Sequence, residues 1–435
     1  MTRNRWMTAG MTLVAAGALT LAACGDDENG GDTRNCDHRV GPDNDNDQAA
    51  LRTLLIDVVG ENETVCLEEG TYITNSQIDI ENQGLTLLGA GQDRTIFDFS
   101  GAIESGTASR GIYITPGTNN VTLRHFAVMD TPGDAIEANG VRNIVMRNMT
   151  VGWNCLECTE NGAYGLYPVQ SVGVIIEDSE VYGAADAGVY VGQSRLIRVA
   201  NNNVYDNVAG IEIENSTDAE VVGNHTYDNT SGILVFNLPS PPIQGGERAK
   251  VHDNLVERNN RRNFARIGTI VEQVPPGTGV MVLACSNNEF TNNTIRDNKS
   301  HGVLIVNYLQ LLGNPSNPDF SRLSMGNYIH GNVFENNGYD PAGLSRAIFN
   351  VLSDEFDLDE MPDVIYDGCH DNWLEDEGVD EFVTQCMNNN GDATWAVTPT
   401  ALLCGPGNER EISLEVPTCT YDELPLQTGI AGDDD

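Results

Sequence analysis

Residues 183–216 read GAADAGVYVGQSRLIRVANNNVYDNVAGIEIENS. This stretch holds two copies of one short pattern, Gly188-Val-Tyr and Gly210-Ile-Glu, which begin 22 residues apart. Further copies begin at Gly165, Gly232, Gly279 and Gly302. Apolar residues occupy every second position of each copy, as expected of a strand with one buried face. A near-fixed period of this kind predicts one structural unit stacked on its own copies.

The repeated unit is too short for a pair of helices, and Asn and Gly separate its apolar strands. Pairs of Asn five residues apart recur between the strands: Asn202/Asn207, Asn224/Asn229, Asn254/Asn259, Asn293/Asn298 and Asn332/Asn337. Asn tolerates the left-handed backbone of a corner, and its amide can bond the coil above. We therefore predict an all-β chain that winds as a right-handed parallel β-helix, with the Asn pairs stacked at its corners in a structural role.

The two ends of the coiled region differ from its middle. Residues 48–59 (QAALRTLLIDVV) have helical apolar spacing, which predicts a short helix that caps the open N-terminal end. From residue 354 onward the coil period is lost, and the chain is acidic and contains four cysteines. We expect residues 45–353 to form the β-helix and residues 354–435 to form a small acidic C-terminal cap or appendage.

The N-terminal residues 1–23 read as a processing segment, because basic residues precede an apolar run that is shorter than a membrane-spanning helix. The run ends in Leu21-Ala22-Ala23-Cys24, which resembles the lipobox of bacterial lipoproteins. An ordinary signal peptide with a coincidental Cys is the alternative. We expect a lipid anchor on Cys24, a flexible tether over residues 24–44, and a location in the bacterial cell envelope, at the outer membrane or facing the periplasm.

The charge of the chain is strongly negative. Acidic residues number 64 against 23 lysines and arginines, for a formal charge of −41. Such a field repels nucleic acid, so no nucleic-acid partner is expected. Six basic residues nevertheless lie close together in sequence: Arg248, Lys250, Arg258, Arg261, Arg262 and Arg266. They form either an anion site or a set of ion pairs with the acidic C-terminal segment.

An exported chain can form disulfides. Nine cysteines remain besides Cys24, so at least one is free, and we expect it to be Cys285 in its apolar strand. Cys36 can pair with Cys66, and a local disulfide between Cys155 and Cys158 would close an inserted loop. The last four cysteines allow three connectivities: Cys369, Cys386, Cys404 and Cys419.

Side chains alternate along a strand, so the third position of each copy points outward while the second and fourth point into the coil. On successive coils this position holds Glu137, Tyr167, Tyr190 and Glu212. At about 4.8 Å per coil they form an outward Tyr/Glu stripe about 15 Å long. Aromatic faces stack on sugar rings, and amides and carboxylates bond hydroxyl groups. The stripe therefore predicts a polysaccharide site.

We assign catalytic roles to Tyr167, Tyr190 and Glu212. The remaining polar residues of the stripe and its flank are assigned to binding: Glu137, Gln170, Gln193, Glu214 and Asn215. Because Glu212 and Glu214 are about 7 Å apart on one strand face, glycoside hydrolysis is allowed. Neither has an evident neighbour that would raise its pKa.

A Tyr acting as acid or base would instead suit a polysaccharide lyase or epimerase, which needs a cation to neutralise the sugar carboxylate. Calcium held by Asp186, Glu212 and Glu214 could supply that cation. No Lys, Arg or His stands at the third or fifth position beside a Tyr, which weakens this reading. A solvated face with aromatic ladders that serve stability is the remaining alternative.

The succession GVYVGQS (188–194), GIEIENS (210–216) and GILVF (232–236) closely resembles an exported bacterial family of parallel β-helix repeat proteins, often lipoproteins, that has no assigned activity. More distantly, the coils are similar to the carbohydrate-binding and sugar-hydrolase β-helix group, which includes polysaccharide lyases and uronan epimerases. These resemblances imply the fold, and they leave the activity open.

Two functional hypotheses follow. The first is a membrane-anchored surface or periplasmic lipoprotein that binds or modifies polysaccharide through the stripe. The second is a non-catalytic structural or assembly protein that works with another exported protein.

Overall fold

The computed structural model describes residues 34–42, 47–105, 109–308, 317, 320–369, 385–405 and 411–430. The chain divides into two compact units, residues 1–35 and 36–435. All helices and strands of the described residues belong to the second unit. Cys24 and the predicted signal peptide lie outside the described residues, so the lipid anchor stays a prediction.

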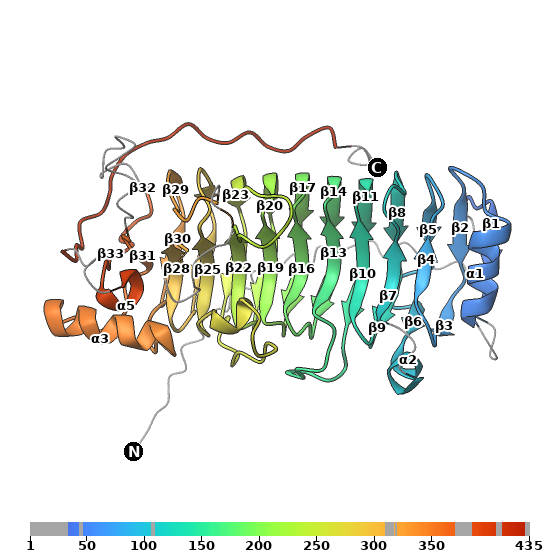
Figure 1. Ribbon diagram of the computed structural model, residues 1–435, viewed down its shortest axis with the longest axis horizontal. Coiled ribbons are helices and arrows are strands. Elements are labelled where there is room, and N and C mark those ends of the chain that lie inside the picture. The colour runs from blue at the N-terminus through green and yellow to red at the C-terminus, as the bar shows by residue number, and fades with distance from the viewer. Residues whose placement is uncertain are drawn as a thin grey trace, which may run out of the picture. The chain divides into compact units, whose positions relative to one another are not determined.

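Three parallel sheets run along the second unit, and the coils between the two ends contribute one strand to each of them (Figure 1). Sheet A consists of β1 (His38–Val40), β2 (Thr64–Leu67), β5 (Thr86–Leu88), β8 (Val121–Arg124), β11 (Arg142–Arg147), β14 (Val172–Glu177), β17 (Arg195–Ala200), β20 (Thr217–Val222), β23 (Glu247–His252), β26 (Glu289–Thr291), β29 (Asn327–His330) and β32 (Gln385–Asn388). Sheet B consists of β3 (Gly70–Ile73), β6 (Thr95–Asp98), β9 (Ala127–Met129), β12 (Thr150–Gly152), β15 (Glu180–Tyr182), β18 (Asn203–Tyr205), β21 (His225–Tyr227), β24 (Leu255–Glu257), β27 (Thr294–Arg296) and β30 (Val333–Glu335). Sheet C consists of β4 (Ile78–Ile80), β7 (Arg110–Ile114), β10 (Asp134–Asn139), β13 (Tyr164–Val169), β16 (Ala187–Gly192), β19 (Ala209–Glu214), β22 (Ser231–Phe236), β25 (Thr278–Leu283), β28 (His301–Val306), β31 (Val364–Tyr366) and β33 (Trp395–Val397).

This arrangement is the predicted right-handed parallel β-helix. The repeated Gly motifs form the strands of sheet C, where Val189 lies opposite Ile211 and Ile211 lies opposite Ile233. All three side chains are fully buried inside the coil. A slip of one residue would turn these apolar side chains outward, so burial fixes the register of every strand pair.

The Asn pairs form two ladders at the corners, as predicted. Except for Asn337, each of these Asn residues donates from Nδ2 to the Oδ1 of the Asn one coil further on, for example Asn224 to Asn254 at 3.0 Å and Asn254 to Asn293 at 2.9 Å. The ladder residues themselves do not adopt the left-handed backbone. The residue before each one does, as at Asp253 (φ 53°) and Arg258 (φ 50°). The corner is thus shared between one residue that turns the chain and one amide that bonds the next coil.

Helices lie at both ends of the stack (Figure 1). At the N-terminal end α1 (Asp47–Asp57) buries Leu51 and Leu55, as expected for a cap, whereas Val58 is exposed. A short α2 (Ser100–Ser105) follows β6. The C-terminal end carries α3 (Leu344–Phe356) and α5 (Ala401–Cys404), and a 3-10 turn, η1 (Val271–Gln273), lies in the longest insertion. Among the described residues, no helix has the length and apolar character needed to cross a membrane.

Residues 354–435 were predicted to form a C-terminal cap or appendage, and part of this segment continues the coils. Strands β31, β32 and β33 extend sheets C and A, so the coils continue beyond residue 353. Residues 411–430 then turn back and run along sheet A towards β11, as the red trace in Figure 1 shows. The sequence pattern predicted neither feature. The strands were missed because they are only three or four residues long and are separated by irregular loops.

The described residues form four disulfides, Cys36–Cys66, Cys155–Cys158, Cys369–Cys404 and Cys386–Cys419. The first two are the predicted pairs. The last two select one of the three connectivities that spacing left open. Cys285 is the free, buried thiol, as predicted.

Candidate functional site

The strand register places the four residues of the predicted stripe on neighbouring coils of sheet C. Tyr113 lies opposite Glu137, Glu137 opposite Tyr167, and Tyr190 opposite Glu212. The rings of Tyr167 and Tyr190 are 5.0 Å apart, in an edge-on arrangement. All four predicted stripe residues therefore belong to one row.

Three further residues lie beside this row at the start of their strands, and the sequence interpretation missed them. Arg110, Asp134 and Tyr164 occupy the first position of their strands, immediately before the Gly or Ala on which the repeats were aligned. The ring of Tyr164 lies 4.6 Å from that of Tyr167 and 4.4 Å from that of Tyr190. Strict alternation places this position inside the coil, so the repeat pattern did not reveal these side chains.

Together these side chains form what we call the acidic–tyrosine cluster: Arg110, Asp134, Glu137, Tyr164, Tyr167, Asp186, Tyr190, Glu212 and Glu214. The expectation that its aromatic rings stand open to solvent is wrong for Tyr190, which is only 5% exposed. Glu212 is 2% exposed and Asp186 8%. Tyr113, Tyr167 and Arg110 are half-buried, and Gln170 is exposed, so the β7–β13 flank is the part of the cluster that solvent reaches.

The cluster is covered by the long insertion, residues 238–278. Phe264 and Ala265 of the insertion are buried in the same packed group of side chains as Tyr190. The guanidinium of Arg266 donates to the backbone carbonyls of Thr159 and Asn161, at 3.1 and 2.6 Å. These bonds lock the long insertion to the shorter loop of residues 152–161.

Asn215 was predicted to bind substrate, but its side chain anchors the insertion instead. Its Nδ2 donates to the carbonyls of Leu238 (2.9 Å) and Ile243 (3.2 Å), and its Oδ1 accepts from the Leu238 N–H (2.8 Å). Gln193 makes a longer contact of the same kind, in which its Oε1 accepts from the Ile243 N–H at 3.4 Å. Gln193 also accepts a bond from the amide of Gln170 at 3.4 Å. Of the predicted amides, Gln170 is the one left open to solvent.

The basic residues of the insertion pair mostly with nearby carboxylates. Arg261 and Arg262 contact Glu157 of the shorter loop at 2.7 and 2.5 Å. Arg248 pairs with Asp218 at 2.7 Å, and Arg258 pairs with Glu257. Within the described residues, Lys250 is the member of this basic set that reaches the C-terminal segment, through Glu423 at 3.8 Å. The predicted pairing with that segment therefore holds for one residue of six.

Burial raises the pKa of the carboxyl groups in the cluster, which corrects the expectation that nothing nearby would do so. Burial lifts the pKa of Glu214 to about 7, against an opposing hydrogen bond from Tyr190. Burial also raises the pKa of Asp134 to about 6. The pKa values of Asp186 and Glu212 lie well above their ordinary range, because both groups are buried and because neighbouring carboxylates repel their charge. The cluster therefore holds protons at neutral pH.

Two carboxyl oxygens in the cluster stand out. Asp186 Oδ1 and Glu212 Oε2 are buried and have no hydrogen-bond partner within the described part of the chain. Buried polar atoms are rarely left in this state, because desolvation without a hydrogen bond is costly. A donor group of a ligand would satisfy them.

The pKa values of the tyrosines are also raised, which makes these side chains harder to ionise. Burial, together with nearby carboxylates, raises the pKa of Tyr164 and Tyr190 well above the ordinary value, and the pKa of Tyr167 is raised for the same reasons. The hydroxyl of Tyr190 donates to Glu214 Oε1 at 2.8 Å. These tyrosines are therefore hydrogen-bond donors rather than ready proton acceptors.

Arg110 supplies the cation that the sequence interpretation found missing beside a Tyr. Its Nε bonds Glu137 Oε2, and its guanidinium lies 4.7 Å from the centre of the Tyr113 ring. Glu137 also accepts a bond from the amide of Asn139 at 3.3 Å. The positive charge of Arg110 is therefore already balanced by Glu137.

Calcium was predicted on Asp186, Glu212 and Glu214. The charge of Glu214 raises the pKa of Asp186, and the charges of Asp186 and Glu214 raise the pKa of Glu212. Across the described ranges, however, no three His, Cys, Asp or Glu side chains are arranged so that they could hold a metal ion. The calcium site stays a prediction.

Beyond the cluster, the same face of sheet C becomes apolar. Phe236, Met281, Leu283, Leu304 and Val306 line a cavity of about 290 Å³. Its other walls come from the insertion, α3 and α5. The face thus divides into a polar, acidic half and an apolar half.

This chain is similar in fold to three solved structures named as an epimerase, a glucanase and a lyase. The A-module of the mannuronan C-5 epimerase of Azotobacter vinelandii is 15% identical with a TM-score of 0.44, covering 81% of this chain and 92% of that chain. The catalytic unit of an α-1,3-glucanase from Streptomyces thermodiastaticus is 12% identical with a TM-score of 0.47, covering 81% of this chain and 54% of that chain. The alginate lyase of a Paenibacillus species is 13% identical with a TM-score of 0.43, covering 69% of this chain and 97% of that chain.

At these identities the likeness assigns no site residue. No curated protein sequence matches the chain. Residues 110–261, which contain the whole acidic–tyrosine cluster, match the family model of the right-handed beta helix region.

Proposed function

We propose that this protein binds or modifies a polysaccharide at the acidic–tyrosine cluster of sheet C. The observation that supports the proposal is the pair of buried, unpartnered oxygens on Asp186 and Glu212 beside the Tyr190–Glu214 hydrogen bond. A packed interior gains nothing from such a group of acids, and carboxyl pKa values shifted by burial are typical of functional sites. Sugar hydroxyls are donors of the kind that these oxygens lack.

Among the possible chemistries, the directions of the pKa shifts favour glycoside hydrolysis. A carboxyl group with a pKa of about 7, such as that of Glu214, can donate a proton near neutral pH. A lyase or epimerase would use a tyrosinate as base, and burial opposes the ionisation of Tyr164 and Tyr190. This environment therefore favours proton donation by a carboxylic acid.

The same charges define the substrate class. Arg110 is neutralised by Glu137, so a uronic acid residue would bring an unpaired carboxylate next to several acidic groups. A neutral polysaccharide avoids that repulsion. It would lie over the solvent-accessible flank formed by Tyr113, Tyr167 and Gln170 and extend towards the buried carboxyl groups.

A second candidate function is a structural or assembly role without chemistry. It is favoured by the burial of Tyr190, Glu212 and Glu214 beneath the 238–278 insertion. In that case the insertion never moves, and the cluster contributes only to the packing of the coils.

A glycan array followed by a reducing-sugar assay separates these candidates. The protein should bind neutral polysaccharides more tightly than uronans, and Glu214→Gln should abolish release of reducing ends while Tyr113→Ala weakens binding. Parallel arrays with calcium and with a chelator test the predicted cation. Absence of binding to every glycan under both conditions would favour the structural role.

We also propose the lipid anchor on Cys24 and a cell-envelope location, which rest on the lipobox-like sequence alone. Cys24→Ala should release the protein from the membrane fraction. Unchanged partitioning of the variant would contradict the anchor.

A further inference from the structure

A second surface with regularly spaced outward side chains lies on sheet A, away from the acidic–tyrosine cluster. One outward position per coil forms a continuous row, in which Arg198 lies opposite Glu220, Glu220 opposite Lys250, and Lys250 opposite Glu289. Charge alternates along these four coils. At one end the row continues into Ile175 and Val145, and at the other into Tyr328 and Cys386.

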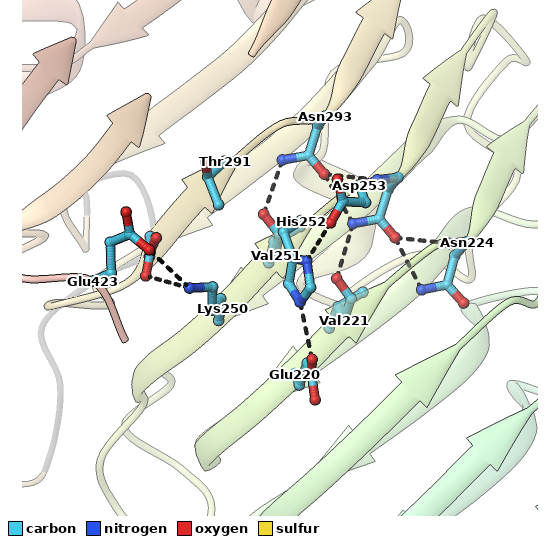
Figure 2. A network of polar contacts seen from close by, with 12 residues as sticks. Glu220, Val221, Asn224, Lys250, Val251, His252, Asp253, Thr291, Asn293 and Glu423 are labelled. Carbon is cyan, nitrogen blue, oxygen red and sulfur yellow. Dashed lines mark hydrogen bonds and ion pairs between the residues drawn. The ribbon is translucent and has the colours of Figure 1, made fainter. Parts of the chain in front are cut away.

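The charges of this row satisfy one another. Arg198 pairs with Glu220 at 3.1 Å, and Lys250 pairs with Glu289 at 3.3 Å. Each carboxylate also meets a histidine, Glu220 with His252 at 3.0 Å and Glu289 with His330 at 2.9 Å. Figure 2 shows His252 held between Glu220 and Asp253, with Lys250 pointing towards Glu423.

Residues 421–430, which we call the strap, lie along this row. Their burial has a period of three: Tyr421, Leu424 and Gln427 are half-buried and Ile430 is buried, while every residue between them is exposed. A period of three is typical of an extended chain of the polyproline II type.

The strap contacts the row from Tyr328 at one end to Val145 and Ile175 at the other. The Tyr421 ring packs 5.9 Å from that of Tyr328, and Ile430 packs against Val145 and Ile175. Between these ends the backbone is held by side chains of the row. The Leu424 N–H donates to Glu289 Oε2 (2.5 Å), Lys250 Nζ donates to the Leu424 carbonyl (2.9 Å), and the Gln427 N–H donates to Glu220 Oε2 (3.1 Å).

The spacing explains why this fit is regular. Three residues of a polyproline II chain advance about 9.3 Å, and two coils of a β-helix advance about 9.6 Å. Every third residue of an extended peptide therefore meets the row again in the same orientation. The repeat of the row therefore matches that of an extended polypeptide, and we call the row with the two cavities beside the strap the groove.

The strap is also a separable occupant of the groove. The charges of the row remain paired without it, because each carboxylate bonds a cation on the coil itself. Open space borders the strap on both sides, in cavities of about 700 Å³ next to His252 and about 400 Å³ next to Tyr328. Removal of the strap would leave the groove formed and its polar groups satisfied.

We propose that this groove on sheet A is a peptide-binding site, which the strap fills in the free protein. The partner is an extended segment of another exported polypeptide that carries an aromatic residue, an aliphatic residue, a polar residue and an aliphatic residue at successive third positions. The strap shows this chemistry in Tyr421, Leu424, Gln427 and Ile430, and it competes with the partner for the groove.

The test uses the chain ended after Thr420 and a fluorescent peptide of residues 421–430. Fluorescence anisotropy should show that the truncated protein binds this peptide and ignores a scrambled one. The full-length protein should bind about 10-fold more weakly, as expected for a groove that is open about a tenth of the time.

A matched pair of peptides tests the contacts. Leu424→Pro removes the N–H that donates to Glu289 and should weaken binding about 10-fold or more. Leu426→Pro changes a residue on the exposed side of the strap and should leave binding unchanged. Equal effects of the two substitutions would contradict the proposed register.

A folded truncated protein that binds the true peptide no better than the scrambled one would overturn the proposal. If the truncated chain does not fold, a protease site between Thr420 and Tyr421 allows the strap to be cut after folding. Exchange of the cut strap for labelled peptide supports a peptide site, and absence of exchange overturns it. A dimer of the full-length protein that the peptide dissociates would mean that a second copy, rather than a foreign peptide, fills the groove.

Discussion

Tyr190 both packs against neighbouring side chains and forms a hydrogen bond with an acidic residue. Its ring packs under the insertion against Tyr164 and Tyr167, and its hydroxyl donates to the carboxyl group of Glu214. The position in the repeat determined that this side chain leaves the coil interior. Its surroundings determined that it is nevertheless buried.

Replacing the Tyr190 hydroxyl should change the acidity of Glu214. The hydroxyl donates to the ionised carboxylate and so lowers its pKa, against the larger effect of burial. Tyr190→Phe should therefore raise the pKa of Glu214 above about 7. NMR titration of labelled Glu side chains measures this change, and Tyr113→Phe, on the open flank, serves as the control that should leave Glu214 unaltered.

Removing the whole ring should destabilise the coil. Tyr190→Ala deletes a large buried side chain, so the free energy of unfolding should fall by about 3–5 kcal/mol. Gln170→Ala, at an exposed position of the preceding coil, should cost less than about 0.5 kcal/mol. Denaturant titration of both variants checks this contrast, and equal stabilities would mean that the ring is not packed.

At the scale of elements, the long insertion decides what solvent can reach. It is fastened at one end by Asn215 and at the other by Arg266, and both attachments use backbone carbonyls. Such bonds do not depend on the side chains of the segments whose carbonyls accept them. The repeat pattern therefore gave no sign of them.

Loosening this insertion should be visible in hydrogen exchange. Asn215→Ala removes three hydrogen bonds to Leu238 and Ile243, so amides of residues 238–246 should exchange faster. Gln193→Ala removes one longer bond and should have a smaller effect. Mass spectrometry of peptides from this loop measures the difference, and exchange as slow as in the parent protein would show that other contacts fasten it.

At the scale of the molecule, the buried acids should make stability depend on pH. Glu214 and Asp367 have pKa values raised to about 7 by burial, and burial raises that of Asp134 to about 6. In the unfolded chain these groups lose their protons near pH 4. Between about pH 5 and 7 the folded protein therefore binds more protons, and its stability falls as the pH rises.

His301 acts in the opposite direction. Burial lowers its pKa to about 3, so below about pH 6.5 the unfolded chain binds a proton that the folded protein does not. Three acids outweigh one histidine, and the Tm should be higher at pH 5.5 than at pH 7.5. Differential scanning calorimetry checks this, and a Glu214→Gln, Asp367→Asn double variant should show a flatter profile. A Tm that rises with pH would show that the acids are solvated.

The sequence by itself determined the coils, because their physics is local and repetitive. Alternation of apolar residues fixed which side chains enter the coil, and a slip of one residue would bury the wrong set. The spacing of Gly188 and Gly210 therefore gave the register of sheet C, and the Asn pairs gave the corner ladders. Cys285 followed from its place in an apolar strand.

The tertiary structure alone decided which of these outward side chains stay outside. Tyr190 is buried because residues 238–278 fold over it. The strap lies on sheet A because residues far along the chain return to it. Both depend on contacts between segments that share no repeat, so neither leaves a periodic trace in the sequence. The raised pKa values of Asp186, Glu212 and Glu214 follow from that burial, since desolvation is a property of the assembled environment and not of the residue.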